Sequence, residues 1–251
     1  MQSVVRCRVR LAISGAAFVA ALGGVVLTLS ASPARAADGG TIEGTVRLAH
    51  PGPPLPAVPV VKDAAVCGHD AKNEAVLVGK GGALRNVVVY VKDAHFAGPP
   101  APTAGASLDQ KRCRYVPHVQ ALTVGTPLSL MNNDAILHNI HANASGMTVF
   151  NVAMPIKGQK LPVPMRKPGL MKLQCDAGHS WMNGWIYVFD HPYFATTDDK
   201  GEFIIKDVPP GDYTLELWHE PTDGQGPGVR TNAKVKVSAD KPAHLDLTFT
   251  L

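Results

Sequence analysis

The residues best suited to do chemistry in this chain lie on one short loop that carries two sulfur atoms and an imidazole. Cys175, His179 and Met182 fall within eight residues, and His138 lies upstream of them. One thiolate, two imidazoles and a weak axial thioether are the ligand set of a type 1 copper site. Such a sulfur-rich site favours copper over magnesium or calcium, holds both Cu⁺ and Cu²⁺, and can pass single electrons. The sequence therefore predicts one copper ion bound by these four side chains.

The two upstream histidines are not expected to share this site. His138 and His141 are three residues apart, and in a strand they point to opposite faces, so we favour His138 and keep His141 as its competitor. Each ligand also has an ordinary alternative: a single histidine is usually a surface or core residue, and a single methionine or cysteine usually packs in a core. The remaining histidines are expected to be structural (His118, His191, His219) or exposed (His50, His69, His95, His244).

A copper site that changes oxidation state has to keep its shape, because rearrangement slows electron transfer. A rigid β scaffold that carries the ligands provides this. Asn139, directly after His138, is expected to hydrogen-bond the metal loop or the thiolate sulfur and so to support the ligands. Met182 is expected at the long axial position, where it tunes the reduction potential.

Residues 1–36 are typical of a secretory signal peptide. Three arginines precede a run of small apolar residues, Leu11 to Leu29, and an A-x-A cleavage site ends at Ala36. We therefore expect a mature chain that begins at Ala37 and lies in the periplasm or is secreted. An uncleaved membrane anchor is the alternative, because the apolar run approaches the length that spans a bilayer.

The formal net charge of +4 comes from this signal segment, which contains four arginines and no acid. Removing it leaves 20 basic and 20 acidic residues. Charge therefore gives no argument for nucleic-acid binding. The chain also lacks the hydrolase, phosphate-loop and dinucleotide motifs, and the H-x-H pairs of a multicopper oxidase. We expect no enzymatic activity.

The cysteine count predicts one disulfide. Cys7 leaves with the signal peptide and Cys175 is assigned to the metal, so Cys67 and Cys113 remain. Two spare cysteines in an exported protein usually pair, and closing a loop of this length stabilises a fold by about 4 kcal/mol in the chain-entropy model. Two free buried thiols are the alternative.

The chain predicts an all-β fold. Its 24 glycines and 21 prolines separate many short alternating segments, which is typical of sandwiches and barrels. The expected strands are Thr41–Leu48, Leu84–Val91, Val119–Val124, Leu128–Met131, Leu170–Cys175, Trp185–Phe189, Glu202–Ile205, Tyr213–Trp218, Thr231–Val237 and His244–Leu251. The expected divisions are a signal peptide (1–36), an N-terminal β segment with a Pro/Gly linker (37–106), a metal-binding domain (107–191) and a small C-terminal sandwich (192–251).

Several of these stretches resemble the cupredoxins, the fold of plastocyanin, amicyanin and azurin. The stretches that carry the resemblance are, in order, Tyr115–His118, Val124–Thr126, Asn132–Asp134, Leu137–Asn139 and the Cys175–Met182 loop. Similar stretches to Leu108–Lys111, Asp190–Phe194 and Leu217–Glu220 occur in bacterial cupredoxin-like proteins described as methylamine-utilisation or plastocyanin-like. The resemblance implies a Greek-key sandwich and copper ligands at His138, Cys175, His179 and Met182.

The C-terminal part resembles a different module. Thr197–Trp218 is similar to carboxypeptidase-regulatory-like and rhamnogalacturonan-lyase-like sandwiches, which are small antiparallel folds of the transthyretin type. Such modules commonly begin with a segment like Gly40–Val46, which here lies at the other end of the chain. We therefore expect the cupredoxin to be inserted into the sandwich, with Thr41–Leu48 and also Leu84–Val91 completing it.

The metal loop departs from the cupredoxin pattern at one point. Three residues separate Cys175 from His179, whereas the loops of this family usually have two or four. Gly178 can absorb the extra residue, because glycine tolerates unusual backbone angles. A distorted copper site is therefore the alternative to a blue one.

The leading interpretation is an exported one-electron carrier that meets a periplasmic redox protein in a weak, transient complex. Trp181, Trp185, Gly178 and Gly184 would form its docking patch, with ordinary core packing as the alternative for the tryptophans. A copper storage or chaperone protein is the first alternative function. The other is a carbohydrate or cell-wall binding module in which the cupredoxin is vestigial.

Overall fold

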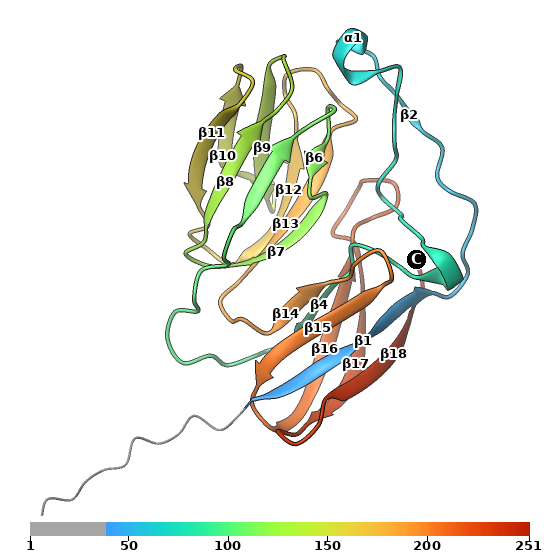
Figure 1. Cartoon of the computed structure of the whole chain (residues 1–251), viewed down its shortest axis with the longest axis vertical. Coiled ribbons are helices and arrows are strands. Elements are labelled where there is room, and N and C mark those ends of the chain that lie inside the picture. The colour runs from blue at the N-terminus through green and yellow to red at the C-terminus, as the bar shows by residue number, and fades with distance from the viewer. Residues whose placement is uncertain (1–38) are drawn as a thin grey trace, which may run out of the picture. The chain divides into compact units, whose positions relative to one another are not determined.

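The computed structural model describes residues 39–251 and shows an all-β protein built from two sandwiches (Figure 1). The expected signal peptide, residues 1–36, and Cys7 lie outside the described residues. Helix is limited within 39–251 to α1 (Ala64–Cys67) and the 3₁₀ turn η1 (Lys80–Gly82). No helix in that range is long and apolar enough to cross a membrane. The all-β class predicted from the sequence is confirmed.

One sandwich, here called the terminal sandwich, combines strands from both ends of the described range. Its strands are β1 Gly40–Leu48, β4 Val88–Val91, β14 Phe194–Thr196, β15 Glu202–Val208, β16 Gly211–His219, β17 Val229–Val237 and β18 Ala243–Phe249. One sheet has the order β15-β1-β18 and the other the order β14-β4-β16-β17. Figure 1 shows β1, in blue, between β15 and β18, in orange and red. The N-terminal segment thus completes the C-terminal sandwich, and the strands β5 to β13 are inserted between β4 and β14.

The terminal sandwich is not purely antiparallel, which corrects the sequence prediction. β1 runs antiparallel to β15 but parallel to β18. Parallel neighbours need a long crossover connection, and here most of the chain provides it. A Cβ added to Gly44 would lie 2.0 Å from the carbonyl oxygen of Leu245, so glycine is required for β18 to approach this closely.

The other sandwich, here called the central sandwich, is formed by consecutive strands. They are β5 Ser107–Gln110, β6 Tyr115–Val116, β7 Val119–Thr123, β8 Pro127–Asn132, β9 His138–Ala144, β10 Met147–Met154, β11 Gln159–Pro164, β12 Gly169–Gln174 and β13 Asn183–Phe189. Its sheets have the orders β10-β9-β12-β13-β7 and β11-β8-β5-β6. Alternating apolar side chains from both sheets are fully buried between them, among them Leu108, Leu130, Ile140, Leu173 and Ile186. This core fixes the ends of β9 and β12, where the predicted ligands lie.

The sequence analysis predicts no strand over β10 or β11, and the reasons are local. β10 has mostly exposed side chains because it lies at the edge of its sheet, so its apolar pattern is weak. β11 contains Pro162 and Pro164 and pairs only with β8, as proline in a sheet edge does. The predicted strand Leu84–Val91 begins later, at Val88.

A segment from the N-terminal part, here called the arm (residues 58–71), packs on the central sandwich. It contains β2 (Val58–Pro59), α1 and β3 (Asp70–Ala71), and the two short strands pair with each other. Val58 and Val60 pack against the central core, and Ala71 belongs to it. The arm therefore reaches from the terminal sandwich to the sandwich that carries the metal loop.

A disulfide fastens the arm to the central sandwich. Cys67 at the end of α1 is bonded to Cys113 in the turn between β5 and β6, with 5.3 Å between their Cα atoms. The disulfide predicted from the cysteine count is thus present. Cys175 is the free cysteine of the described residues and is buried.

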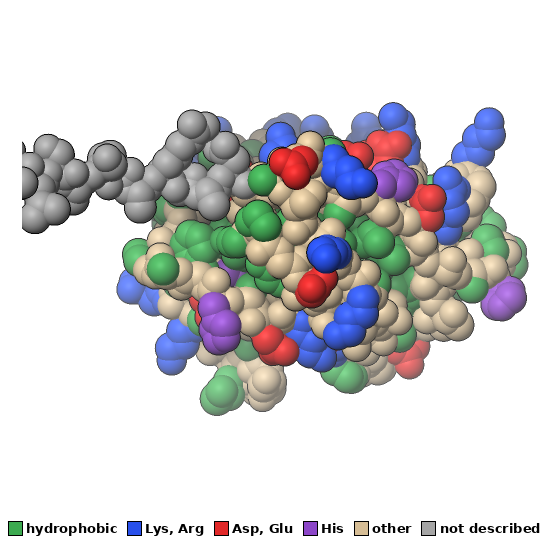
Figure 2. Space-filling view, turned by 90° about the horizontal axis from the view of Figure 1, so that it is seen from below, with side chains coloured by type: hydrophobic (Ala, Val, Ile, Leu, Met, Phe, Trp, Pro, Cys, Tyr) green, Lys and Arg blue, Asp and Glu red, His purple; other side chains and the backbone are tan. Residues whose placement is uncertain are grey.

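The two sandwiches share a buried apolar seam. It contains Val88, Tyr90 and Trp218 from the terminal sandwich and Val119, Trp185 and Phe189 from the central one. The rings of Trp185 and Trp218 meet edge-on with centroids 5.4 Å apart. Basic and acidic side chains are interspersed on the face shown in Figure 2, in keeping with the equal numbers of basic and acidic residues after position 36.

Replacing Cys67 and Cys113 together by serine is expected to lower the free energy of unfolding by about 4 kcal/mol, because the bond closes a loop with a sequence separation of 46 residues. Urea unfolding of the metal-free protein measures this loss. Cys175→Ser, which leaves that loop closed, is the matched control. An unfolding midpoint for the double variant equal to that of the parent chain would contradict the prediction.

Candidate metal centre

The topology brings two distant parts of the sequence to one end of the central sandwich. β12 ends at Gln174, and residues 175–182 connect it to its neighbour β13. β9 lies on the other side of β12 and begins with His138. The loop and the first residue of β9 therefore meet above adjacent strands of one sheet.

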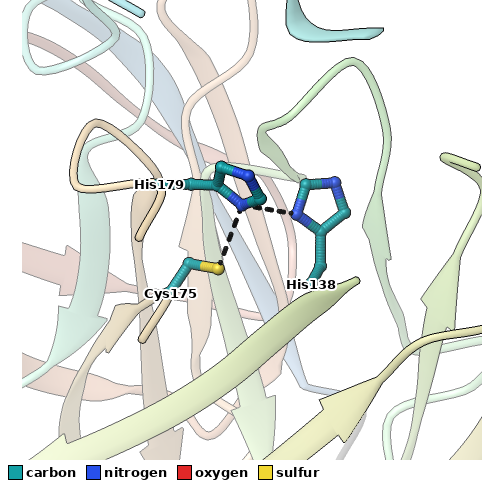
Figure 3. A group of neighbouring side chains, drawn as sticks. All are labelled: His138, Cys175 and His179. Carbon is teal, nitrogen blue, oxygen red and sulfur yellow. Dashed lines mark hydrogen bonds between the residues drawn. The ribbon is translucent and has the colours of Figure 1, made fainter. Parts of the chain in front are cut away.

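Three donor atoms converge at this point (Figure 3). Nδ1 of His138 lies 3.0 Å from Nδ1 of His179, and Sγ of Cys175 lies 3.5 Å from the same Nδ1 of His179. All three atoms lie within 4.8 Å of one another. Both imidazoles are fully buried and Cys175 is 6% exposed. The structure thus brings together three of the four predicted ligands.

Each imidazole is held from behind by a carboxylate. Nε2 of His138 lies 2.9 Å from Oδ2 of Asp134, and Nε2 of His179 lies 2.8 Å from Oδ2 of Asp63. A carboxylate on one ring nitrogen fixes the proton there and leaves the other nitrogen as a metal ligand. The two Nδ1 atoms then face each other at hydrogen-bond distance. A soft cation that replaces the proton between them can bind both nitrogens and the sulfur, so the residues fit copper.

Asp134 is itself held by a turn that contains the disulfide. Its two carboxylate oxygens accept the backbone N–H groups of Arg112 and Cys113, each at 2.8 Å. Both of these residues have positive φ, 54° and 52°, which points consecutive N–H groups at one anion. Non-glycine residues adopt this conformation at a cost, and here it orients the carboxylate that orients His138. The sulfur of Cys113 also lies near His138, but the disulfide removes it as a ligand.

The arm supplies the carboxylate for the other imidazole. Asp63 precedes α1 and has a left-handed backbone, with φ 54°. Its neighbour Lys62 donates from Nζ to the carbonyl oxygen of Ala177 at 2.7 Å and passes close to Gly178. These contacts place the arm over the metal loop and leave no part of His179 exposed.

Burial of Cys175 and His138 favours the uncharged form of each side chain. Burial raises the pKa of the Cys175 thiol, against the opposing effect of the backbone groups of Ala177, Asn139 and His179. Burial also lowers the pKa of His138. A metal ion would therefore replace the thiol proton, as thiolate ligation requires.

The remaining predicted site residues lie around this cluster. Met182 ends the loop, is 1% exposed and donates its N–H to the carbonyl oxygen of His179 at 2.9 Å. Asn139 accepts the N–H of Asp176 through Oδ1 at 3.0 Å, so it holds the start of the loop. The competitor His141 lies outside the cluster, 2.7 Å from the Asp176 carboxylate.

The prediction that Trp181 and Trp185 form part of a surface docking patch is wrong. Trp181 and Trp185 are only 7% and 4% exposed. Their indole N–H groups are bonded to buried acceptors, the carbonyl oxygen of Cys113 at 3.1 Å and a carboxylate oxygen of Glu220 at 2.9 Å, as buried tryptophans require. Both side chains are core residues.

The loop accommodates its unusual spacing at one glycine. Gly178 has φ 94°, a backbone conformation that residues other than glycine rarely adopt. The extra residue is therefore taken up by the turn before His179, whose ring still reaches the cluster.

Sequence reasoning missed the two carboxylates. The sequence could have indicated Asp134, because it lies only four residues before His138, within the turn that leads into β9. Asp63 had none: it is 116 residues from His179, and only the folded arm brings them together.

Comparisons with known proteins cover parts of the chain. A family model described as polysaccharide lyase family 4, domain II, matches residues 168–245, a range that begins directly before β12 of the central sandwich and ends in β18. No curated protein sequence matches the chain.

Among solved structures, a purple cupredoxin from Nitrosopumilus maritimus is similar, with 23% identity over 34% of this chain and 99% of its own, at a TM-score of 0.30. A reduced point mutant of amicyanin has 21% identity over 40% of this chain and 98% of its own, at 0.30. A copper-containing nitrite reductase from Thermus scotoductus SA-01 has 21% identity over 40% of this chain and 25% of its own, also at 0.30. Because these similarities span two fifths of the chain or less, what the site holds is argued from its own residues.

Asp63→Ala is expected to weaken copper binding by about 10- to 100-fold, because removing the carboxylate behind a ligating imidazole loosens its orientation and lowers its basicity. Competition of the metal-free protein against a chelator of known affinity measures the change. Asp212→Ala, an exposed carboxylate on β16, is the matched control. Equal affinities for the two variants would show that Asp63 does not support the site.

Proposed function

We propose that the chain is an exported copper protein that carries single electrons. His138, Cys175 and His179 hold one copper ion, with Met182 as the weak axial ligand. The observation that carries the proposal is the convergence of two imidazole Nδ1 atoms and one thiol sulfur within 4.8 Å, with a carboxylate behind each ring. Copper bound by such a set supplies a one-electron couple.

The surroundings of the site support electron transfer rather than substrate chemistry. The three donors come from adjacent elements of one buried sheet, and two carboxylates and a disulfide restrain them, so the protein keeps the ligands in place in both oxidation states. His179 is fully buried beneath the arm, which leaves no open position for a substrate at that ring. We therefore propose no enzymatic activity for this site.

The arm is the proposed contact for a periplasmic redox partner. It covers His179 and presents two exposed apolar side chains, Val61 at 74% and Val66 at 40%. A small apolar contact of this kind suits a weak, transient complex. It replaces the docking patch that the buried tryptophans were expected to provide.

Copper storage or delivery would use the same ligands without redox turnover. The cover over His179 favours a resident ion, because metal exchange at that ring requires the arm to move. A second candidate function is carbohydrate or cell-wall binding by the terminal sandwich, favoured by the family-model match to polysaccharide lyase family 4, domain II. Retention on insoluble polysaccharide that is unchanged in Cys175→Ser would support this second function.

Adding one equivalent of Cu²⁺ to the mature protein is expected to produce an intense visible absorption band, because a buried thiolate bound to copper gives a charge-transfer transition. Cys175→Ser is expected to lose the band while keeping the fold, as judged by circular dichroism. The visible spectrum of both proteins makes this test.

The wavelength of the dominant band also shows whether the metal loop distorts the copper site. A dominant band at shorter wavelength than in blue copper proteins would identify a distorted site and implicate the extra residue at Gly178. A colourless protein that does not bind copper would contradict the proposed function.

Met182→Gln is expected to lower the reduction potential, because an amide oxygen stabilises Cu²⁺ more than a thioether does and the axial ligand tunes type 1 sites. Protein-film voltammetry measures the potential of the copper-loaded variants. Met147→Gln, at a side chain 71% exposed, is the control and is expected to leave it unchanged. Tight Cu⁺ binding without a reversible couple would instead support storage.

A further inference from the structure

A second buried histidine, away from the metal ligands, is paired with a carboxylate across the two sandwiches. His118 lies directly before β7, and Glu220 directly follows β16. Nε2 of His118 lies 2.6 Å from Oε1 of Glu220, and Nε1 of Trp185 donates to Oε2 at 2.9 Å. The side chains of the pair are 5% and 2% exposed. Both oxygens of the glutamate are therefore satisfied within the seam.

The other nitrogen of this imidazole is not satisfied. Nδ1 of His118 is buried and has no hydrogen-bond partner among the described residues. The backbone of Asn183 lies on that side and favours the charged ring, but outside hydrogen-bonding geometry. A buried polar atom without a partner costs about 1–3 kcal/mol, so its partner is expected to come from outside the chain.

The imidazole lines two cavities that adjoin at shared residues. The larger has a volume of about 200 Å³ and extends towards Arg85 and Asn86. The smaller has about 20 Å³ and extends towards Trp181 and Met182 on the metal loop. The lining residues common to both are Lys72, Glu74, Arg114 and His118. We call the two cavities together the recess; their lining includes Asn86, near the terminal sandwich, and Met182, on the metal loop.

The recess carries positive charge. Glu74, its one acidic lining residue, is paired with Arg114 at 3.1 Å. Lys72 is exposed at the mouth and has no carboxylate within ion-pair distance in residues 39–251. Arg85 adds a further cation, which is paired with Asp199 outside the lining. Because Glu74 is paired, Lys72 is left as a cation of the lining without an ion-pair partner in residues 39–251.

The Glu220 partner favours the protonated form of the His118 ring. Burial lowers the pKa of His118, but the hydrogen bond and the charge of Glu220, together with the charge of Glu74, outweigh burial, and the pKa is raised overall. A protonated imidazole has N–H groups at both Nε2 and Nδ1. In the protonated ring the unpartnered Nδ1 is therefore a donor that requires an acceptor.

We propose that this recess binds a small anion, a carboxylate or an inorganic oxyanion, with one oxygen accepting the hydrogen bond from Nδ1 of His118. Lys72 and Arg114 balance the charge of the anion, since charge-assisted hydrogen bonds to such cations are the strong ones. Glu220 binds Nε2 on the other side of the His118 ring, and Trp185 donates to Glu220, so the two residues hold the ring in place. The volume of the larger cavity excludes a polymer and fits a molecule of a few carbon atoms.

Nuclear magnetic resonance of the imidazole nitrogens tests this proposal in the metal-free mature protein, so that its outcome does not depend on copper. Acetate, succinate and inorganic phosphate are each titrated at constant ionic strength set with chloride. A saturable shift of Nδ1 of His118 is expected with at least one of them. Saturation by the carboxylates alone or by phosphate alone identifies which source of anion the recess selects.

Lys72→Met and Arg114→Gln are expected to weaken the binding by about tenfold or more, because each removes a charged hydrogen-bond donor. Lys160→Met, an exposed lysine on β11, is the matched control and is expected to bind as the parent chain does. Lys72 is exposed, so Lys72→Met tests the site without disturbing the seam between the sandwiches. His118→Gln, in contrast, can loosen that seam. The absence of a saturable shift with all three anions would overturn the proposal and leave water as the partner of Nδ1. Equal affinities in Lys72→Met and Lys160→Met would overturn it as well.

Discussion

Two imidazole nitrogens held face to face are the constraint on which the site and much of the fold depend. With a carboxylate on the far nitrogen of each ring, the Nδ1 atoms of His138 and His179 lie 3.0 Å apart beside the sulfur of Cys175. At this distance a proton can be shared between the two nitrogens as a hydrogen bond. A soft cation can replace that proton and bind both nitrogens together with the sulfur. Close packing of the central core keeps the rings from turning away.

The two supporting carboxylates are not independent of each other. The backbone carbonyl oxygen of Asp63 accepts the N–H of Cys67 at 3.0 Å, Cys67 is bonded to Cys113, and the N–H of Cys113 binds Asp134. One covalent bridge thus joins the turns that orient both histidines. The disulfide is usually considered for what it does to the unfolded chain; here it also fixes two distant parts of the folded one. The arm is part of the metal centre as much as the loop is.

Sequence reasoning succeeded where chemistry is local and failed where it depends on tertiary contacts. The ligand types, the loop and the disulfide follow from residue identity and spacing, and the all-β class follows from alternation and turn residues. Asp63 could not be found, because its distance along the chain carries no signal. For Trp181 the sequence left a surface patch and core packing both open, because an aromatic beside a loop has the same pattern in either case. The folded structure buries it and supplies a carbonyl of a distant turn as the acceptor for its N–H. The strands β10 and β11 were missed because edge strands need no continuous apolar face.

The insertion of the central sandwich has a consequence for the order in which the chain folds. β5 to β13 are contiguous and can pair as soon as they are available, but β1 pairs only with β15 and β18, so its ladder closes only when the last strand has been made. Contacts of such long sequence separation form slowly, since loop closure has to precede them. When the central sandwich folds first, it brings β4 and β14 side by side. This shortens the effective loop that has to close before β1 can pair. Until that ladder closes, β1 has unpaired sheet edges, and at this stage the chain is most exposed to aggregation and proteolysis.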